Sequence, residues 1–288
     1  MKSEMSVEEY ARRQLDRLGK SAKQLRGGEP NAIHDARVAS RRLDAALDVL
    51  LARGPREGRG AESKVLQRLR RRLGRLRERE GITQSLRTLL ETEDPKTRDA
   101  GERLLDRLAR RVTRGRRRAV QRIQSRHREV LVLRAVSELR SLPDADALSR
   151  DAQRWADARR AQAERALAIA RRTKRNQDLH QARLTVKKWR YALEVLAQAT
   201  GEPPQKENER LIELQRCLGS IHDDDVLLVF LRRWSRRWRR RNHQARASAL
   251  TPLLRRLSAA RRLELRRLDE AFGPGRSLEL SSTSPSGS

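Results

Sequence analysis

Apolar residues recur every three or four positions along most of the chain, which is the spacing of one buried face of an α-helix. Leu66, Leu69, Leu73 and Leu76 follow this spacing, and a longer segment repeats it from Leu104 to Ile123. No segment alternates convincingly between apolar and polar residues, as a half-buried strand would. The pattern predicts an all-α fold of about ten helices. A candidate break near Gly115 divides the helix predicted over 96–140.

Clusters of glycine and proline mark the predicted helix ends. They lie at 27–30, 53–60, 93–95, 141–144 and 201–204. Residues 273–288 are rich in Gly, Pro and Ser and predict a disordered tail. The helical domain is therefore expected over residues 5–272, with a first half over about 5–142 and a second half over about 143–272.

An internal repeat relates the two halves. The stretch 34–50 aligns without gaps to 180–196, and seven of its seventeen positions are identical. The pair Leu73-Gly74 is echoed by Leu218-Gly219. The two offsets, 146 and 145 residues, are nearly equal, so the halves have comparable length. Repeats in a compact helical protein are expected to pack about a pseudo-twofold axis, which would bring the two histidine-bearing helices together.

Each repeated helix has an apolar face and a basic face when residues are placed about 100° apart. The apolar positions are Ala36, Ala39, Leu43, Ala46, Leu47 and Leu50 in the first copy, and Ala182, Trp189, Ala192, Leu193 and Leu196 in the second. The basic stripe holds His34, Arg37 and Arg41 in the first copy, and His180, Arg183, Lys187 and Arg190 in the second.

A basic stripe on a helix is usually only a solvated face, and a lone histidine usually has a structural role. These two stripes are different because they recur in register and each begins with one of only five histidines. They are the candidate ligand-facing surfaces.

The charge balance indicates what kind of ligand to expect. The formal net charge is +30 at pH 7, and nine lysines leave 59 arginines among the 68 basic residues. The guanidinium group offers a fixed fork of donors that suits phosphate and carboxylate oxygens. The expected partner is a polyanion. Eight aromatic residues are too few for a run of stacking platforms along single-stranded nucleic acid.

Membrane and secretory classes are disfavoured. The longest apolar run, 226–231, is far short of the roughly 18–20 residues of a membrane span. The N-terminus lacks the apolar stretch of a secretory signal. The single Cys217 fits a reducing cytosol, so a cytoplasmic protein without a membrane partner is expected.

Two further clusters invite chemical interpretations. His222-Asp223-Asp224-Asp225 resembles a metal-binding run, but consecutive residues on a helix point in different directions. A helix start with acids near its positive end, or an ion pair to a nearby arginine, is the preferred interpretation. Trp189 is expected in the core, Tyr191 nearer the basic side, and Trp234 and Trp238 in packing, with stacking against arginine as the alternative.

The paired motifs resemble the CHAD family, the conserved histidine α-helical domain. The resemblance rests on His34-x-x-Arg37-Val38-x-x-Arg41-Arg42-Leu43, on its copy His180-x-x-Arg183-x-x-x-Lys187-Lys188-x-Arg190-Tyr191, and on the Leu-Gly element after each. It implies two four-helix bundles around a basic central pore, binding of inorganic polyphosphate, and association with polyphosphate granules. No catalytic residue, metal or cofactor is expected. The implied ligand-facing residues are His34, Arg37, Arg41, Arg42, His180, Arg183, Lys187, Lys188 and Arg190.

The chain departs from the family pattern in its first half. Asp44 stands where a basic residue is common, and Arg77-Glu78 stands where Arg-Asp is common. Asp44 either weakens that half's hold on phosphate or belongs to an internal ion pair. The second half is the closer match.

Two other function classes are weighed against polyphosphate binding. Net charge alone would also support non-specific DNA or RNA binding. A phosphohydrolase is disfavoured because the Glu-x-Glu-x-Lys mark of the triphosphate tunnel enzymes is approached only by 91–96, with the wrong spacing and a proline. Histidines near phosphate would gain protons more easily, so binding is expected to strengthen as pH falls through about 6.5.

Overall fold

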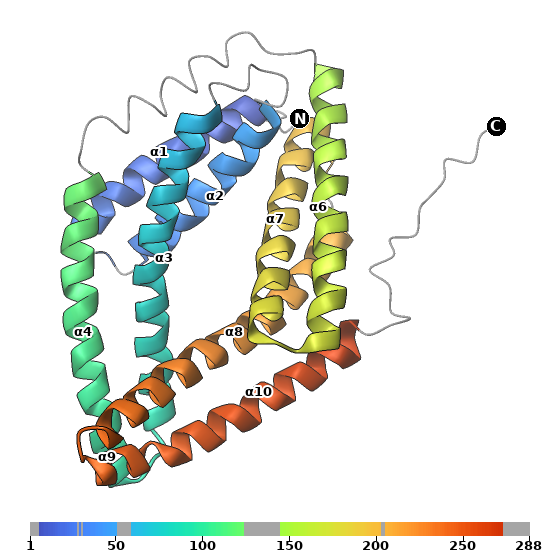
Figure 1. The fold of residues 1–288 in the computed structure, drawn as a ribbon. Helices are drawn as coiled ribbons and strands as arrows, with labels where there is room; N and C mark the ends of the chain where they lie inside the picture. The colour runs from blue at the N-terminus through green and yellow to red at the C-terminus, as the bar shows by residue number, and fades with distance from the viewer. Residues whose placement is uncertain are drawn as a thin grey trace. The chain divides into compact units, whose positions relative to one another are not determined.

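A computed structural model describes residues 6–27, 29, 31–50, 59–123, 145–202 and 205–272. The described residues are helical apart from short turns, and no strand occurs among them, which confirms the all-α prediction (Figure 1). The helices are α1 (Val7–Gly27), α2 (Ala32–Leu50), α3 (Arg59–Leu90), α4 (Pro95–Ile123), α6 (Ala145–Thr173), α7 (Asn176–Thr200), α8 (Gln205–Arg239), α9 (Gln244–Ala249) and α10 (Thr251–Phe272).

The chain forms two compact units. Unit 1 comprises Met1–Arg159 and Tyr191–Pro203, and unit 2 comprises Arg160–Arg190 and Pro204–Ser288. Helices α6 and α7 each contribute residues to both units. The predicted division into halves near 142 and the pseudo-twofold arrangement around a pore remain predictions. The predicted tail, 273–288, lies outside the described residues.

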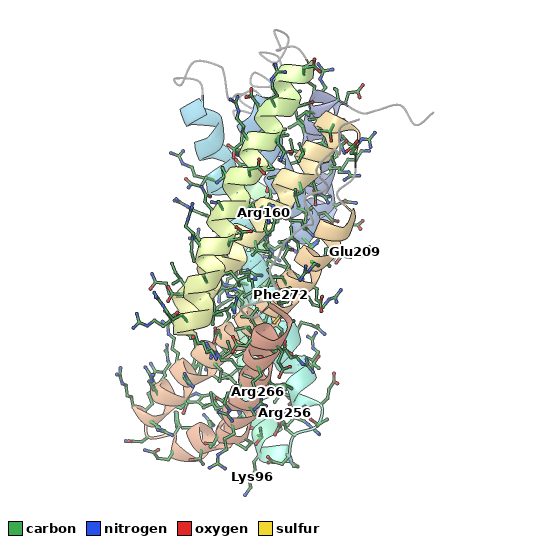
Figure 2. The ribbon with its side chains drawn as sticks, turned by 90° about the vertical axis from the view of Figure 1, so that its right-hand side faces the viewer. Lys96, Arg160, Glu209, Arg256, Arg266 and Phe272 are labelled. Atoms are coloured by element: carbon green, nitrogen blue, oxygen red, sulfur yellow. The ribbon has the colours of Figure 1, made fainter. Side chains whose placement is uncertain are left out.

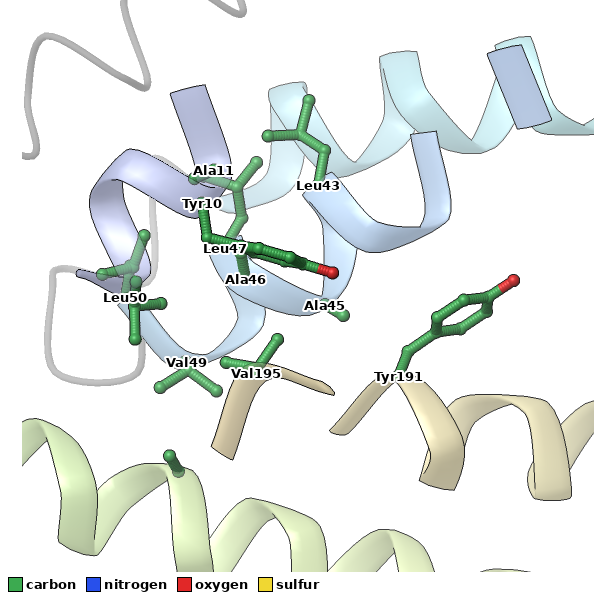
Figure 3. Packing of buried hydrophobic residues seen from close by; sticks show 12 residues of the cluster. Tyr10, Ala11, Leu43, Ala45, Ala46, Leu47, Val49, Leu50, Tyr191 and Val195 are labelled. Carbon is green, nitrogen blue, oxygen red and sulfur yellow. The ribbon is translucent and has the colours of Figure 1, made fainter. Parts of the chain in front are cut away.

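Unit 1 is built on the apolar face predicted for the first repeated helix. The side chains of Leu43, Ala46, Leu47 and Leu50 on α2 pack with α1, α6 and the end of α7 (Figure 3). Tyr191 belongs to this cluster and is only 6% exposed, so its expected place near the basic side was wrong. Its ring fills the core because the tyrosine lies on the apolar side of the end of α7 that joins unit 1.

A half-buried polar contact links three helices of this unit. The Arg42 guanidinium donates to both carboxylate oxygens of Glu194, at 2.6 Å from Nε and 3.2 Å from Nη2. The Tyr10 hydroxyl donates to the same carboxylate at 3.1 Å. Burial, followed by the charge of Glu194, raises the pKa of Tyr10, so the phenol stays protonated and keeps this hydrogen bond. The end of α7 is thereby fixed to α1 and α2.

Helix α4 runs through Gly115 without the expected break. The glycine instead permits a close approach to α3. A Cβ built at Gly115 would lie 2.6 Å from Leu76 Cδ2, and Leu76 is buried. The packing of α3 against α4 therefore leaves no room for a side chain at Gly115. The glycine marks a close contact between these two helices and not a helix end.

Unit 2 contains a helical hairpin in which α9 joins α8 to α10 (Figure 1). Its core is formed by leucines of α8 and α10, including Leu211, Leu214 and Leu257. Trp234 and Trp238 are 6% and 5% exposed, which confirms their packing role. Arg237 also stacks over the Trp234 ring, 5.1 Å from its centroid, so both interpretations of that tryptophan hold.

The acidic run of α8 lies in the middle of the helix, so its interpretation as a helix start was wrong. The alternative, an ion pair, is confirmed for Asp225. This buried carboxylate accepts from Arg261 Nε at 2.5 Å, and Arg261 Nη2 also donates to the Lys174 carbonyl and to Asn176 Oδ1. Arg261 therefore fixes α8 and α10 to the turn between α6 and α7, where Lys174 has a positive φ of 51°.

A search of the described residues for a helix long and apolar enough to cross a membrane finds none.

Candidate anion-binding site

The second basic stripe lies on α7 within unit 2. The opposite face of the helix is held in the core by Ala182, Val186 and Trp189, and Trp189 is only 1% exposed, as predicted. This packing orients the helix so that His180 is exposed, while Arg183 and Lys187 are half-buried. Arg190, one turn further on, is also half-buried, and Lys188 is exposed.

A histidine from α8 meets this stripe. The Nδ1 atoms of His180 and His222 are 3.4 Å apart, and the ring centroids are separated by 4.9 Å. Burial, followed by the neighbouring charges of Arg183, His180 and Lys187 in that order, lowers the pKa of His222 to about 3. The ring of His222 is therefore neutral at physiological pH and lies among basic side chains.

We call His180, Arg183, Lys187 and His222 the cationic cluster. These side chains come from two helices, and the charges of Arg183, His180 and Lys187 oppose protonation of His222. Bringing them together costs free energy in the unliganded protein. An anion placed among them would relieve this repulsion and accept hydrogen bonds from guanidinium and ammonium groups. The arrangement suits an anion.

His222 was missed as a site residue by the sequence analysis, which considered it only for metal binding. The signal was present, because His222 follows the Leu218-Gly219 element four residues later, within the second echo of the repeat. The histidine helix and the Leu-Gly helix meet in space, so the two repeated motifs form one site. Pairing the motifs would have identified it.

The first copy shows the same local pairing within unit 1. His34 is exposed on α2, while Arg37 and Arg41 are half-buried. A Cβ built at Gly74 of α3 would lie 3.3 Å from Arg37 Nη1, so the guanidinium passes closely over the Leu-Gly element. Arg37 and Arg183 are equivalent in the repeat. In both units a basic stripe therefore faces the Leu-Gly helix that follows it.

Arg42 lies apart from the first stripe. It is about 80° around α2 from His34 and forms the ion pair with Glu194 described above. The side chain already has a half-buried carboxylate partner within unit 1, which gives it a structural role whatever the stripe binds.

The acidic run near the cluster does not form a metal centre in the described part of the chain, where no group of three or more His, Cys, Asp or Glu side chains is placed to hold a metal ion. Burial raises the pKa of Asp224 to about 6, and its acidic neighbours Glu264, Asp223 and Asp225 contribute. The negative charges of the run therefore oppose ionisation of Asp224.

Comparisons with known proteins agree with this architecture. The family model described as CHAD domain matches residues 9–232. The fold is similar to the crystal structure of the CHAD domain from the plant Ricinus communis, with a TM-score of 0.66, 19% identity, and coverage of 92% of this chain and 93% of that one. It is equally similar to PptA from Streptomyces chartreusis, with a TM-score of 0.66, 19% identity, and coverage of 92% and 96%. No curated protein matches the chain.

Proposed function

The chain belongs to the CHAD domain family, and from this premise we propose that it binds inorganic polyphosphate without catalysing a reaction on it. The proposed contacts are the basic stripes of α2 and α7 together with His222. Arg42 supports the first stripe from within the core.

The cationic cluster is the observation that carries this proposal. Burial and then the charges of Arg183, His180 and Lys187 lower the pKa of His222 to about 3, so positive charge is concentrated around a neutral ring. A polyanion supplies negative charge at several adjacent points, and a linear chain of phosphates can follow a stripe that extends along a helix. Arg183, Lys187 and Arg190 recur at the three- and four-residue spacing that keeps them on one side of α7.

The binding energy comes from charge-assisted hydrogen bonds and from counterion release. Guanidinium groups donate to phosphate oxygens in pairs, and each such bond is shorter and stronger than a neutral one. Every phosphate that an arginine or lysine neutralises releases condensed counterions, as in complexes with nucleic acids. The affinity is therefore expected to fall steeply as salt concentration rises.

The same binding would carry the protein to polyphosphate granules in the cell. Localisation of a fluorescent fusion, in cells with and without polyphosphate, tests this part. Foci that disappear with the polymer support granule targeting, and a diffuse signal in both cells contradicts it.

The direct test replaces the α7 stripe. We expect Arg183→Ala, Lys187→Ala and Arg190→Ala together to weaken binding of long-chain polyphosphate by roughly a hundredfold or more, because several charge-assisted hydrogen bonds are lost. The matched control removes three exposed arginines elsewhere on α6 and α8, through Arg165→Ala, Arg172→Ala and Arg216→Ala. Both variants are compared by titration at one salt concentration after their helical content is verified. Equal affinity of the two variants would overturn the site assignment.

A further inference from the structure

The far end of the unit 2 hairpin carries an unusual concentration of arginine. Residues 226–263 contain twelve arginines and no Asp, Glu or Lys. All of these arginines are exposed except Arg261, which pairs with Asp225. They extend from the last turns of α8 through α9 into α10, and Figure 2 labels one of them, Arg256, on α10.

Packing explains why these arginines form a continuous surface on α8. Leu231, Trp234 and Trp238 are buried against the rest of the hairpin. At about 100° per residue, the arginines at 232, 233, 236, 237 and 239 cover an arc of about 160° on the opposite side. We call these five residues, with Arg240 just beyond the helix, the arginine face. It is a convex surface of one sign of charge.

Helix stability accounts for only part of this pattern. Basic residues in a last turn favour the negative end of the helix dipole, and this explains Arg236, Arg237 and Arg239. The effect fades beyond one turn, so it does not explain Arg232 or Arg233. Like charges at three- and four-residue spacing also repel one another. The arginine face therefore costs stability in the free protein, as the cationic cluster does.

The arginine face lies away from the cationic cluster. His222 and Arg232 are on the same continuous helix and are separated by ten residues, which is about 15 Å along its axis. Arg239 is about 26 Å from His222 by the same rise. The family-model match ends at residue 232, so most of this surface lies beyond the part of the chain that the family model describes.

We infer that the arginine face is a second polyphosphate-binding surface and that unit 2 can thereby hold two segments of the polymer at once. This inference rests on the proposed function. Two contacts on one unit would let the protein join neighbouring polyphosphate chains, or bind one long chain more tightly through a high local concentration. The protein would then condense the polymer as well as bind it.

Two features favour a flexible chain without bases as the occupant. The tryptophans beneath the arginines are buried, so the bases of single-stranded nucleic acid find no stacking platform there. A DNA duplex is stiff over about 50 nm, so it can touch a convex face only along a narrow line. Polyphosphate can bend around the arc and reach arginines on both of its edges.

The test replaces four residues of the arginine face with glutamine, through Arg232→Gln, Arg233→Gln, Arg236→Gln and Arg240→Gln. Arg237 is kept because it stacks over Trp234. The matched control removes the same charge from exposed positions of α4, through Arg110→Gln, Arg111→Gln, Arg117→Gln and Arg118→Gln. Both variants and the unaltered chain are titrated with long-chain polyphosphate, tripolyphosphate and duplex DNA, and light scattering records condensation.

We expect the arginine-face variant to lose roughly tenfold or more in affinity for long chains, with a salt slope smaller by about 3 for four lost contacts. Light scattering with long chains should disappear. Tripolyphosphate, too short to span the ~15 Å to the cluster, should bind with little change. Behaviour equal to that of the α4 control would overturn the inference. Loss of DNA binding with polyphosphate binding retained would also overturn it, in favour of nucleic acid as the occupant.

The same titrations separate this inference from the proposed function. If the unaltered chain binds neither long-chain polyphosphate nor tripolyphosphate, both the proposed function and the inference of a second surface are wrong. If the unaltered chain binds both forms but the arginine-face variant behaves like the α4 control, the proposed function stands and only the inference of a second surface is wrong.

Discussion

Individual side chains in this protein carry charge in two different ways. Some basic groups are neutralised inside a unit, as Arg42 is by Glu194 and Arg261 is by Asp225. Others are gathered around a neutral ring, as Arg183 and Lys187 are around His222. The first kind stabilises the fold, and the second kind is expected to bind a ligand. Sequence alone placed Arg42 with the second kind, because its carboxylate partner is 152 positions away along the chain.

Replacing Arg42 distinguishes the two kinds. Arg42→Gln leaves the half-buried carboxylate of Glu194 without its cationic partner, so it should lower the free energy of unfolding by roughly 1–3 kcal/mol. Once folded, the variant should bind polyphosphate within about twofold of the original affinity. Urea denaturation and a binding titration measure the two effects. A large loss of affinity with unchanged stability would show that Arg42 contacts the ligand.

His222 makes stability depend on pH in a defined direction. Its pKa in the folded protein is about 3, below the value of about 6.5 expected in the unfolded chain. The unfolded state therefore binds the proton first, and the stabilising contribution is fully present above pH 6.5 and decreases as pH falls toward 3. Between pH 7 and pH 5, the free energy of unfolding of His222→Gln should decrease less than that of the unaltered protein. An unchanged pH dependence in this variant would contradict the assignment.

The same residue sharpens the expected pH dependence of binding. Phosphate oxygens near His222 would offset the charges of Arg183 and Lys187, so bound polyphosphate should raise the pKa of His222 from about 3. Its titration by NMR, with and without the polymer, measures this shift. Binding that strengthens through pH 6.5 requires a group other than unliganded His222, because that ring is neutral over this range.

At the scale of helices, the apolar pattern predicted most of the architecture. The apolar faces of α2 and α7 are buried as expected, because Leu43, Ala182 and Trp189 leave water only when their helices pack. Helix ends were harder to predict. Gly115 does not end a helix, and the turns near Lys174 and Asn242 adopt positive φ without a glycine. Such turns depend on tertiary contacts, including those of Arg261 with the Lys174 carbonyl and Asn176.

Two of the mid-helix glycines, Gly115 and Gly19, should respond oppositely to alanine. Gly115→Ala forces a Cβ against Leu76, so it should destabilise unit 1 by about 1–3 kcal/mol. Gly19 lies in α1 with nothing within 4 Å of a built Cβ, so Gly19→Ala should stabilise the helix by about 0.5–1 kcal/mol. Thermal or urea unfolding of both variants measures the signs. Stabilisation by Gly115→Ala would show that α3 and α4 do not approach closely there.

Across the whole molecule, the net charge of +30 attracts anions in general, and particular basic surfaces are proposed to bind them. The sequence identified the histidine helices through the repeat. It could not reveal how His222 reaches His180, because that contact depends on the packing of α7 against α8. The sequence also did not predict that the arginines of α8 share one face of the helix, because that face is defined by the burial of Trp234 and Trp238 on the other side.

The polymer identity is the central claim, and a competition titration tests it most directly. The protein is saturated with labelled long-chain polyphosphate at physiological salt and then titrated with duplex DNA or unlabelled polyphosphate at matched phosphate concentrations. Unlabelled polyphosphate should displace the label, whereas DNA should do so only at concentrations at least about tenfold higher, because a stiff duplex cannot follow the basic stripes as a flexible phosphate chain can. Displacement by DNA at a comparable phosphate concentration would contradict the claim and leave a general polyanion-binding protein.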